Sequence, residues 1–257
     1  MRAHESISEA IRQAAAEGRP ALVAFLTAGF PTRDAFTASL AAIAEAADVV
    51  EIGVPFSDPM ADGMTIQRSS QVALRQGVSL HWILETLAGL PSRPGAPLLL
   101  MSYLNPLLAY GLDRLPGRAA AAGVAGFIVP DLPFEEAGEL REALEGEGLA
   151  LIQMVTPVTP PERLARVCAG ARGFVYAVTM TGTTGKSVAV PEDVLQYMDR
   201  VRAVSSAPVC AGFGIRSPEQ VARMAGHVDG VVVGSALVEV LERGEDPAAF
   251  LGALRAG

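Results

Sequence analysis

The segment EIGVPFSDPMADG, residues 51–63, places three acidic side chains directly after a short apolar run. Glu51 stands at the end of that run, which is expected to be a buried strand. Because side chains alternate across a strand, Glu51 shares one face with Val49, while Val50 and Ile52 share the other. If the first face points into the protein, burial raises the pKa of the carboxyl and suits it to proton exchange near neutral pH. The alternative is a Glu paired with an internal arginine or a peptide N–H.

The other acids of this region have structural alternatives. Asp62 precedes an expected helix, and Asp often caps helices. However, the proline-rich connection that carries Asp62 is much longer than the roughly 2–6 residues of a typical strand-to-helix loop, which favours a catalytic role beside Glu51. Asp58 precedes Pro59 and is expected to stabilise a turn. Asp131 is expected to cap the helix that follows it, although it also lies after a strand.

Other chemistries lack the residues they need. Lys186 is the only lysine, and it lies in a loop rich in Gly and Thr rather than in the desolvated pocket that a Schiff-base amine requires. The three histidines, His4, His81 and His227, are far apart in the sequence, which argues against a metal site built on clustered histidines. Carboxylates are therefore the candidates for catalysis.

The composition also limits the possible partners and compartments. A net charge of −8 argues against a nucleic-acid partner, which would require a basic face. Two cysteines, Cys168 and Cys210, exclude a disulfide scaffold and fit a reducing cytoplasm. No apolar run reaches the ~18 residues needed to span a membrane. The first 18 residues have the pattern of an amphipathic helix and not of a signal peptide.

Short β-branched runs alternate with helical patterns along the whole chain. The expected strands cover residues 21–26, 48–52, 97–101, 125–129, 149–153, 173–178, 207–211 and 230–234. Nearly continuous apolar strands, each followed by a helix, predict a parallel sheet covered by helices. Eight such units in 257 residues predict an α/β fold, a single (β/α)8 TIM barrel domain over residues 1–257 with an extra N-terminal helix. Catalytic groups of such barrels lie at the C-terminal ends of the strands, where Glu51 stands.

Two glycine-containing segments predict a phosphate site. AGFGIRSPEQ (211–220) follows the seventh strand and GSALVEV (234–240) follows the eighth, where barrels of this kind often bind phosphate. A third loop, residues 179–193, is expected to be a lid that closes on substrate, the alternative being an ordinary flexible loop. Its GTTGKS sequence does not match a nucleotide-binding P-loop, because Met180 stands where that motif needs glycine.

Six segments of the chain resemble, in the same order, motifs of the tryptophan synthase α subunit family. They are EIGVPFSDPMADG, MSYLNPLLAYG, GFIVPDLPFEE, VTMTGTTG, GFGIRSPEQV and VVVGSALV. The resemblance implies a TIM-barrel lyase of tryptophan biosynthesis, active in the cytoplasm and independent of metal ions. Its reaction would be the retro-aldol cleavage of indole-3-glycerol phosphate to indole and glyceraldehyde 3-phosphate, with no cofactor in this chain.

The resemblance also implies roles for individual residues. Glu51 would be the general acid–base that protonates indole C3 and helps to remove the side-chain hydroxyl proton. Asp62 would hold the indole N–H and stabilise positive charge on the ring, and Tyr176 would be the active-site tyrosine. The residues implied to bind substrate are Phe25, Leu100, Gly185, Phe213, Gly214, Gly234 and Ser235.

The family implied by these motifs pairs with a pyridoxal-phosphate β subunit in an α2β2 tetramer and passes indole to it through a tunnel. The positions that match partner-facing loops are Pro55, Phe56, Asp58 and Asn105. Met180 and Thr183 depart from the arginine and valine of many relatives, which affects lid closure and coupling. The alternatives are a stand-alone lyase that releases indole, a non-catalytic barrel that activates the β subunit, and another sugar-phosphate barrel such as an isomerase or a lysine-dependent cyclase.

Overall fold

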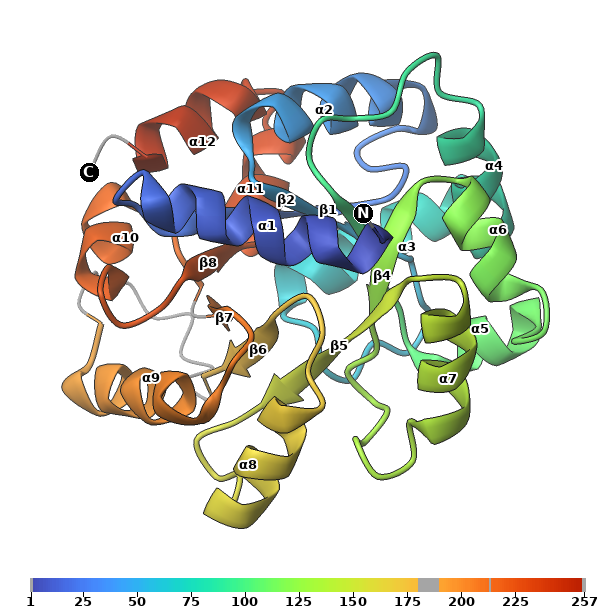
Figure 1. Ribbon diagram of the computed structural model, residues 1–257. Helices are drawn as coiled ribbons and strands as arrows, with labels where there is room; N and C mark the ends of the chain where they lie inside the picture. The colour runs from blue at the N-terminus through green and yellow to red at the C-terminus, as the bar shows by residue number, and fades with distance from the viewer. Residues whose placement is uncertain (1, 180–189, 213, 256–257) are drawn as a thin grey trace.

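The fold is a closed barrel of parallel strands, seen in a computed structural model that describes residues 2–179, 190–212 and 214–255 (Figure 1). The strands are β1 (Ala21–Thr27), β2 (Val49–Gly53), β3 (Leu98–Met101), β4 (Val124–Ile128), β5 (Ala150–Val155), β6 (Val175–Val178), β7 (Val209–Gly212) and β8 (Gly230–Val233). Each strand pairs with the next in parallel, and β8 pairs with β1. The predicted TIM barrel is confirmed.

Apart from the first, the helices follow the strands, and they cover the outside of the barrel (Figure 1). They are α1 (Ala3–Ala16), α2 (Arg33–Ala46), α3 (Met64–Arg75), α4 (Leu80–Ala88), α5 (Leu104–Tyr110), α6 (Leu115–Ala121), α7 (Gly138–Gly146), α8 (Pro161–Ala169), α9 (Glu192–Val204), α10 (Pro218–Met224), α11 (Ser235–Glu242) and α12 (Pro247–Arg255). Within the described part of the chain, no helix combines the length and apolar character needed to cross a membrane.

The extra N-terminal helix, α1, closes one end of the barrel. Figure 1 shows it lying across the strands. Its buried residues Ile7, Ile11 and Ala14 join the cluster of side chains that fills the barrel interior. The Ser8 hydroxyl donates a 2.7 Å hydrogen bond to the carbonyl of Gly173, just before β6. Because α1 covers the ends at which the strands begin, the opposite end, where the strands finish, is the open mouth.

Two apolar layers lie on the two sides of the barrel wall. Val49 belongs to the inner cluster, whereas Val50 and Ile52 belong to the larger cluster between the strands and the helices. Since successive residues of a strand alternate, Glu51 points inward with Val49. The face predicted for Glu51 is therefore confirmed.

Candidate active site

Glu51 is an isolated acid inside the barrel. It lies on β2 between Phe25 of β1 and Leu99 of β3, and it is 0% exposed. Among the described residues, neither of its carboxylate oxygens has a hydrogen-bond partner. Burial raises its pKa to about 8, because the charged form is poorly solvated there. The alternative of a Glu paired with arginine or peptide N–H finds no support in the described part of the chain.

Tyr176 lies on the same inner surface, on β6. Burial raises the pKa of its hydroxyl well above the ordinary value, and the nearby negative charge of Glu51 raises it further. A Cβ on Gly212, in the adjacent strand β7, would lie 2.6 Å from a ring carbon of Tyr176 and 3.1 Å from its hydroxyl oxygen. Gly212 was not singled out in the sequence, and it is needed because the tyrosine ring occupies that space.

Asp62 lies at the end of the long β2–α3 connection and is half-buried. The helix-cap alternative for Asp62 is wrong, because the N-cap of α3 is Gly63 and no side-chain cap hydrogen bond is present. Burial raises the pKa of Asp62 to about 6, and a hydrogen bond with Tyr103 opposes this increase. The carboxyl therefore titrates close to neutral pH.

Tyr103 is a site residue that the sequence analysis missed. It follows β3 and is 4% exposed, and its hydroxyl oxygen accepts a 2.9 Å hydrogen bond from the N–H of Ala61. Its ring packs on Phe56, with 5.1 Å between the centroids. Burial raises the pKa of its hydroxyl, and the charge of Asp62 adds to this effect. Tyr103 thus fixes the backbone before Asp62 and contacts the carboxyl itself.

The segments that follow β7 and β8 carry the residues predicted to bind phosphate. Gly214 has φ +72°, and a Cβ on it would meet no atom of the described residues within 4 Å, so its backbone conformation favours glycine. Gly234 precedes α11, and its carbonyl accepts the N–H groups of Leu237 and Val238. The N–H groups that begin the helix at Ser235 have no partner within it and carry the positive end of the helix dipole. This arrangement suits an anion such as phosphate.

The strand register brings the anion site within reach of the acid. Phe25 of β1 pairs with Glu51 on one side, and its neighbour Ala24 pairs with Val233 on the other. A Cβ on Gly234 would lie 3.9 Å from the Cβ of Phe25. Since neighbouring strands are about 4.8 Å apart, two strand spacings of roughly 10 Å separate Glu51 from Gly234. One small molecule with a ring and a phosphate spans this distance, with Phe25 between its two ends.

One predicted pocket residue is misplaced. Leu100 was expected to line the substrate pocket, but it pairs with Ile52 and belongs to the cluster beneath the helices. Leu99 and Met101 occupy the inner side of β3 instead. The prediction for Leu100 is therefore wrong. The predicted residues Gly185 and Phe213, together with Met180 and Thr183 of the expected lid, lie outside the described residues.

Three of the four residues expected at a partner interface lie on the β2–α3 connection, and the fourth, Asn105, lies in the first turn of α5. Pro55 is buried and Phe56 half-buried, whereas Asp58 and Asn105 are exposed. The Ser57 hydroxyl donates a 2.5 Å hydrogen bond to Asp58, in keeping with the expected turn.

Large apolar side chains are also exposed on the β2–α3 connection, at the start of α3 and on α5. Met60 is 82% exposed, Met64 77% and Leu108 52%.

Asp131 was expected to cap the helix that follows it. Instead it accepts hydrogen bonds of 2.9 and 3.2 Å from the N–H of Leu104, the first residue of α5.

Comparisons with known proteins place this site in a family. The profile of the family described as "Tryptophan synthase alpha chain" matches residues 11–253. The tryptophan synthase alpha chain of Solidesulfovibrio magneticus is 47% identical over 246 residues, covering 95% of this chain and 96% of the relative. The chain belongs to the tryptophan synthase alpha chain family.

Solved structures of the tryptophan synthase alpha chain family share the fold. The tryptophan synthase subunit alpha of Legionella pneumophila superposes with a TM-score of 0.89 at 32% identity, covering 100% of this chain and 98% of that one. A Mycobacterium tuberculosis tryptophan synthase structure gives 0.89 at 40% identity, covering 97% and 96%. The resemblance seen in the sequence motifs is confirmed.

Membership of the family defines the activity. The tryptophan synthase alpha chain is a lyase of tryptophan biosynthesis that cleaves indole-3-glycerol phosphate, and it is the cofactor-free subunit of the enzyme. The predicted function is thus confirmed, and the stand-alone lyase is not favoured. In the described ranges, no three His, Cys, Asp or Glu side chains gather as metal ligands.

Proposed function

We propose that Glu51, Asp62 and Tyr176 form the catalytic centre of a single-domain barrel spanning residues 1–257, and that Gly214, Gly234 and Ser235 hold the substrate phosphate. The observation that carries this proposal is the isolation of Glu51, a fully buried carboxyl without a described partner. An inward acid with a pKa of about 8 is costly to the fold and is suited to donating a proton at neutral pH.

The acid–base chemistry requires one carboxyl to act twice. Neutral Glu51 donates its proton to indole C3, and the positive charge that results on the ring is stabilised by ionised Asp62 near the indole N–H. The carboxylate of Glu51 then accepts the proton of the side-chain hydroxyl next to C3. The bond between C3 and that carbon breaks, its electrons return to the ring, and indole and the aldehyde form. Glu51 ends the cycle protonated, so the protons balance.

Tyr176 and Phe25 shape the space in which the ring would lie. Both are on the inner wall near Glu51, and both are matched by an adjacent glycine that leaves room for the ring. A Cβ on Gly53 would lie 2.5 Å from the end of the Phe25 ring, as one on Gly212 would clash with Tyr176. These paired glycines support a pocket whose aromatic walls have fixed positions.

Indole release by the purified chain tests the assignment. Wild-type protein is mixed with indole-3-glycerol phosphate, and indole formation is followed beside Glu51→Gln and the exposed control Glu147→Gln. Loss of activity in Glu51→Gln alone is the expected result. Full activity in Glu51→Gln would show that another group moves the protons.

We also propose a β-subunit partner that carries pyridoxal phosphate, assembled with this chain as α2β2 in the cytoplasm. The exposed apolar side chains Met60, Met64 and Leu108 lie beside Pro55, Phe56, Asp58 and Asn105 and support a protein contact at the mouth. Steady-state rates of indole formation measured with and without a β subunit test this. No acceleration by any β subunit of a tryptophan-producing relative would favour a stand-alone lyase.

A further inference from the structure

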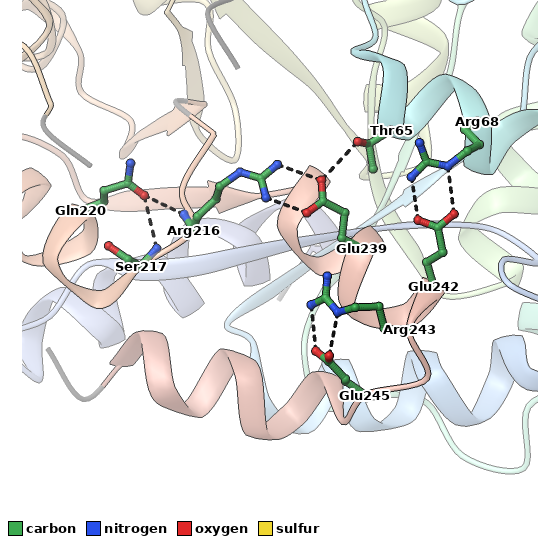
Figure 2. Close-up of polar contacts among 9 residues, drawn as sticks. All are labelled: Thr65, Arg68, Arg216, Ser217, Gln220, Glu239, Glu242, Arg243 and Glu245. Atoms are coloured by element: carbon green, nitrogen blue, oxygen red, sulfur yellow. Dashed lines mark hydrogen bonds and ion pairs between the residues drawn. The ribbon is translucent and has the colours of Figure 1, made fainter. Parts of the chain in front are cut away.

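A cluster of ion pairs joins three segments next to the mouth (Figure 2). At its centre, the carboxylate of Glu239 on α11 accepts hydrogen bonds of 2.7 and 2.9 Å from the two terminal nitrogens of Arg216. The same carboxylate accepts a 3.3 Å hydrogen bond from the hydroxyl of Thr65 on α3. Glu239 therefore contacts the β7–α10 loop and α3 at once.

These contacts join the two halves of the proposed phosphate cradle. Arg216 is two residues after Gly214, and Glu239 is one helical turn after Ser235. The backbone N–H of Arg216 also donates a 2.8 Å hydrogen bond to the side chain of Gln220. Arg216 thus connects the loop that contains Gly214 to α10 through its backbone N–H and to α11 through its guanidinium group.

The hydrogen bond from Thr65 connects Glu239 with the chain segment next to Asp62. Thr65 lies three residues after Asp62, in the first turn of α3. The hydrogen bonds that the Glu239 carboxylate accepts thus connect the start of α3, next to Asp62, with the β7–α10 loop and α11. These last two segments carry the proposed phosphate-binding residues. In the sequence these three segments are up to 174 residues apart.

We propose that Glu239 is a positioning residue, which through Arg216 and Thr65 holds the two halves of the phosphate cradle in register with each other and with the segment that carries Asp62. The proposal rests on the phosphate role assigned above to Gly214, Gly234 and Ser235. Arg216 keeps Glu239 ionised, since its hydrogen bonds lower the pKa of this carboxyl.

The partial exposure of Arg216 and Glu239 allows a role in positioning to be distinguished from a role in folding stability. The side chains of Arg216 and Glu239 are 48% and 27% exposed, and ion pairs of this exposure contribute little to folding stability. A displaced binding group, in contrast, weakens binding of the part of the substrate that it contacts. The effect of Glu239 should therefore be seen in phosphate binding and not in the melting temperature.

The chain supplies a matched control in Glu242. Its carboxylate pairs with Arg68 at 2.9 and 2.6 Å and also joins α11 to α3, without a described contact to the β7–α10 loop. Glu239→Gln is expected to raise KM for indole-3-glycerol phosphate about three- to ten-fold with kcat changed less than about two-fold, the pattern of lost uniform binding. Glu242→Gln is expected to leave KM within about two-fold of wild type.

Inorganic phosphate provides a readout that does not depend on proton transfer. As a competitive inhibitor it should lose affinity in Glu239→Gln by the same factor as KM and keep it in Glu242→Gln. Arg216→Gln should raise KM similarly, and the double variant should add little, because both changes break one contact.

Equal KM and phosphate inhibition in the two glutamate variants would overturn the role of Glu239 while leaving the lyase assignment intact. Additive effects of Arg216→Gln and Glu239→Gln would also overturn it. A wild-type enzyme that cleaves substrate without competitive inhibition by phosphate would remove the cradle assignment and this proposal together.

Discussion

Two acids three residues apart, Asp48 just before β2 and Glu51 within it, have opposite surroundings. Asp48, just before the strand, accepts hydrogen bonds of 2.8 Å from each of two Arg19 nitrogens, 2.8 Å from the N–H of Leu22 and 3.1 Å from Arg255. Glu51, the central residue of the strand, has no described partner. One carboxylate is saturated with donors, and the other is isolated in an apolar interior.

The difference shows how this barrel separates stability from chemistry. Asp48 joins the segment after α1, strand β1 and the C-terminal helix α12 at the end that α1 closes. Glu51 makes no such contact with the described residues, and its desolvation opposes folding whenever it is charged. Barrels of this class usually place stabilising contacts at the N-terminal end and catalytic groups at the C-terminal end. Here the two acids of this kind are only three residues apart, one just before β2 and one within it.

The largest expected effect follows from removing the isolated acid. Glu51→Gln keeps the shape of the side chain but cannot transfer the proton, so kcat/KM for indole-3-glycerol phosphate should fall by about 10²–10⁴-fold. Steady-state indole release measures this. A fall of less than about ten-fold would mean that Glu51 is not the proton donor.

The same variant has an expected effect on stability of the opposite sign. The pKa of Glu51 is raised from 4.5 to about 8 by folding, so its contribution to stability is fully present below about 4.5 and is lost as pH rises towards 8. The glutamine in Glu51→Gln does not ionise, so this variant does not lose stability in this way as the pH rises. Its melting temperature relative to wild type should therefore increase between pH 5 and pH 8. A constant difference across that range would show that Glu51 is not desolvated in solution.

The pH dependence of activity tests the two site acids together. Asp62, with a pKa of about 6, must be ionised, and Glu51, with a pKa of about 8, must begin protonated. We expect kcat/KM to be bell-shaped between these values and to fall about ten-fold per pH unit beyond either limb. Asp62→Asn should remove the acid limb and lower the plateau. A rate that still rises above pH 9 would show that Glu51 acts first as a base.

The saturated acid should show the reverse behaviour. Asp48→Asn leaves Arg19 and Arg255 without their shared carboxylate, and the unfolding free energy should fall by about 1–3 kcal/mol while kcat/KM stays within about two-fold. Denaturant unfolding and indole release measure the two effects. Glu17→Gln is the matched control, because Glu17 pairs with the same Arg19 but is 49% exposed, and its loss should be too small to resolve. A large loss of activity in Asp48→Asn would contradict the idea that stability and catalysis depend on opposite ends of the barrel.

The inward direction of Glu51 could be predicted from the sequence because only one phase of the strand fits an acid. The same reasoning failed for Leu100, where three consecutive leucines give no alternation from which to read the phase. The pairing of β3 with β4 also shifts between Leu98 and Leu99. A uniformly apolar strand therefore indicates that it is buried without indicating which side chains face the pocket.

Contacts between distant loops could not be predicted either. Asp131 has the local sequence of a helix cap, yet it caps α5, which precedes it by 27 residues. Tyr103 is 42 residues from Ala61, and nothing local to either residue indicates their hydrogen bond. The barrel brings such loops together at its mouth because parallel strands end at the same side. Local patterns thus identified the acids, and the closure of the barrel determines which groups support them.

The smallest expected effect concerns one of those supporting groups. Tyr103→Phe removes the hydroxyl that accepts the Ala61 N–H and contacts Asp62, while it keeps the ring packed on Phe56. Positioning of Asp62 should weaken, and kcat/KM should fall about two- to five-fold, as expected for the loss of one supporting hydrogen bond.

The direction of the accompanying pH shift distinguishes this from a general loosening of the loop. The hydrogen bond from Tyr103 lowers the pKa of Asp62 against the larger effect of burial, so its removal should move the acid limb of the pH profile above about 6 and leave the basic limb in place. A shift towards lower pH would mean that Asp62 becomes exposed to water when Tyr103 is changed. In that case the burial of Asp62 would depend on the hydroxyl of Tyr103. Of the two site acids, only Glu51 would then owe its raised pKa to the barrel itself.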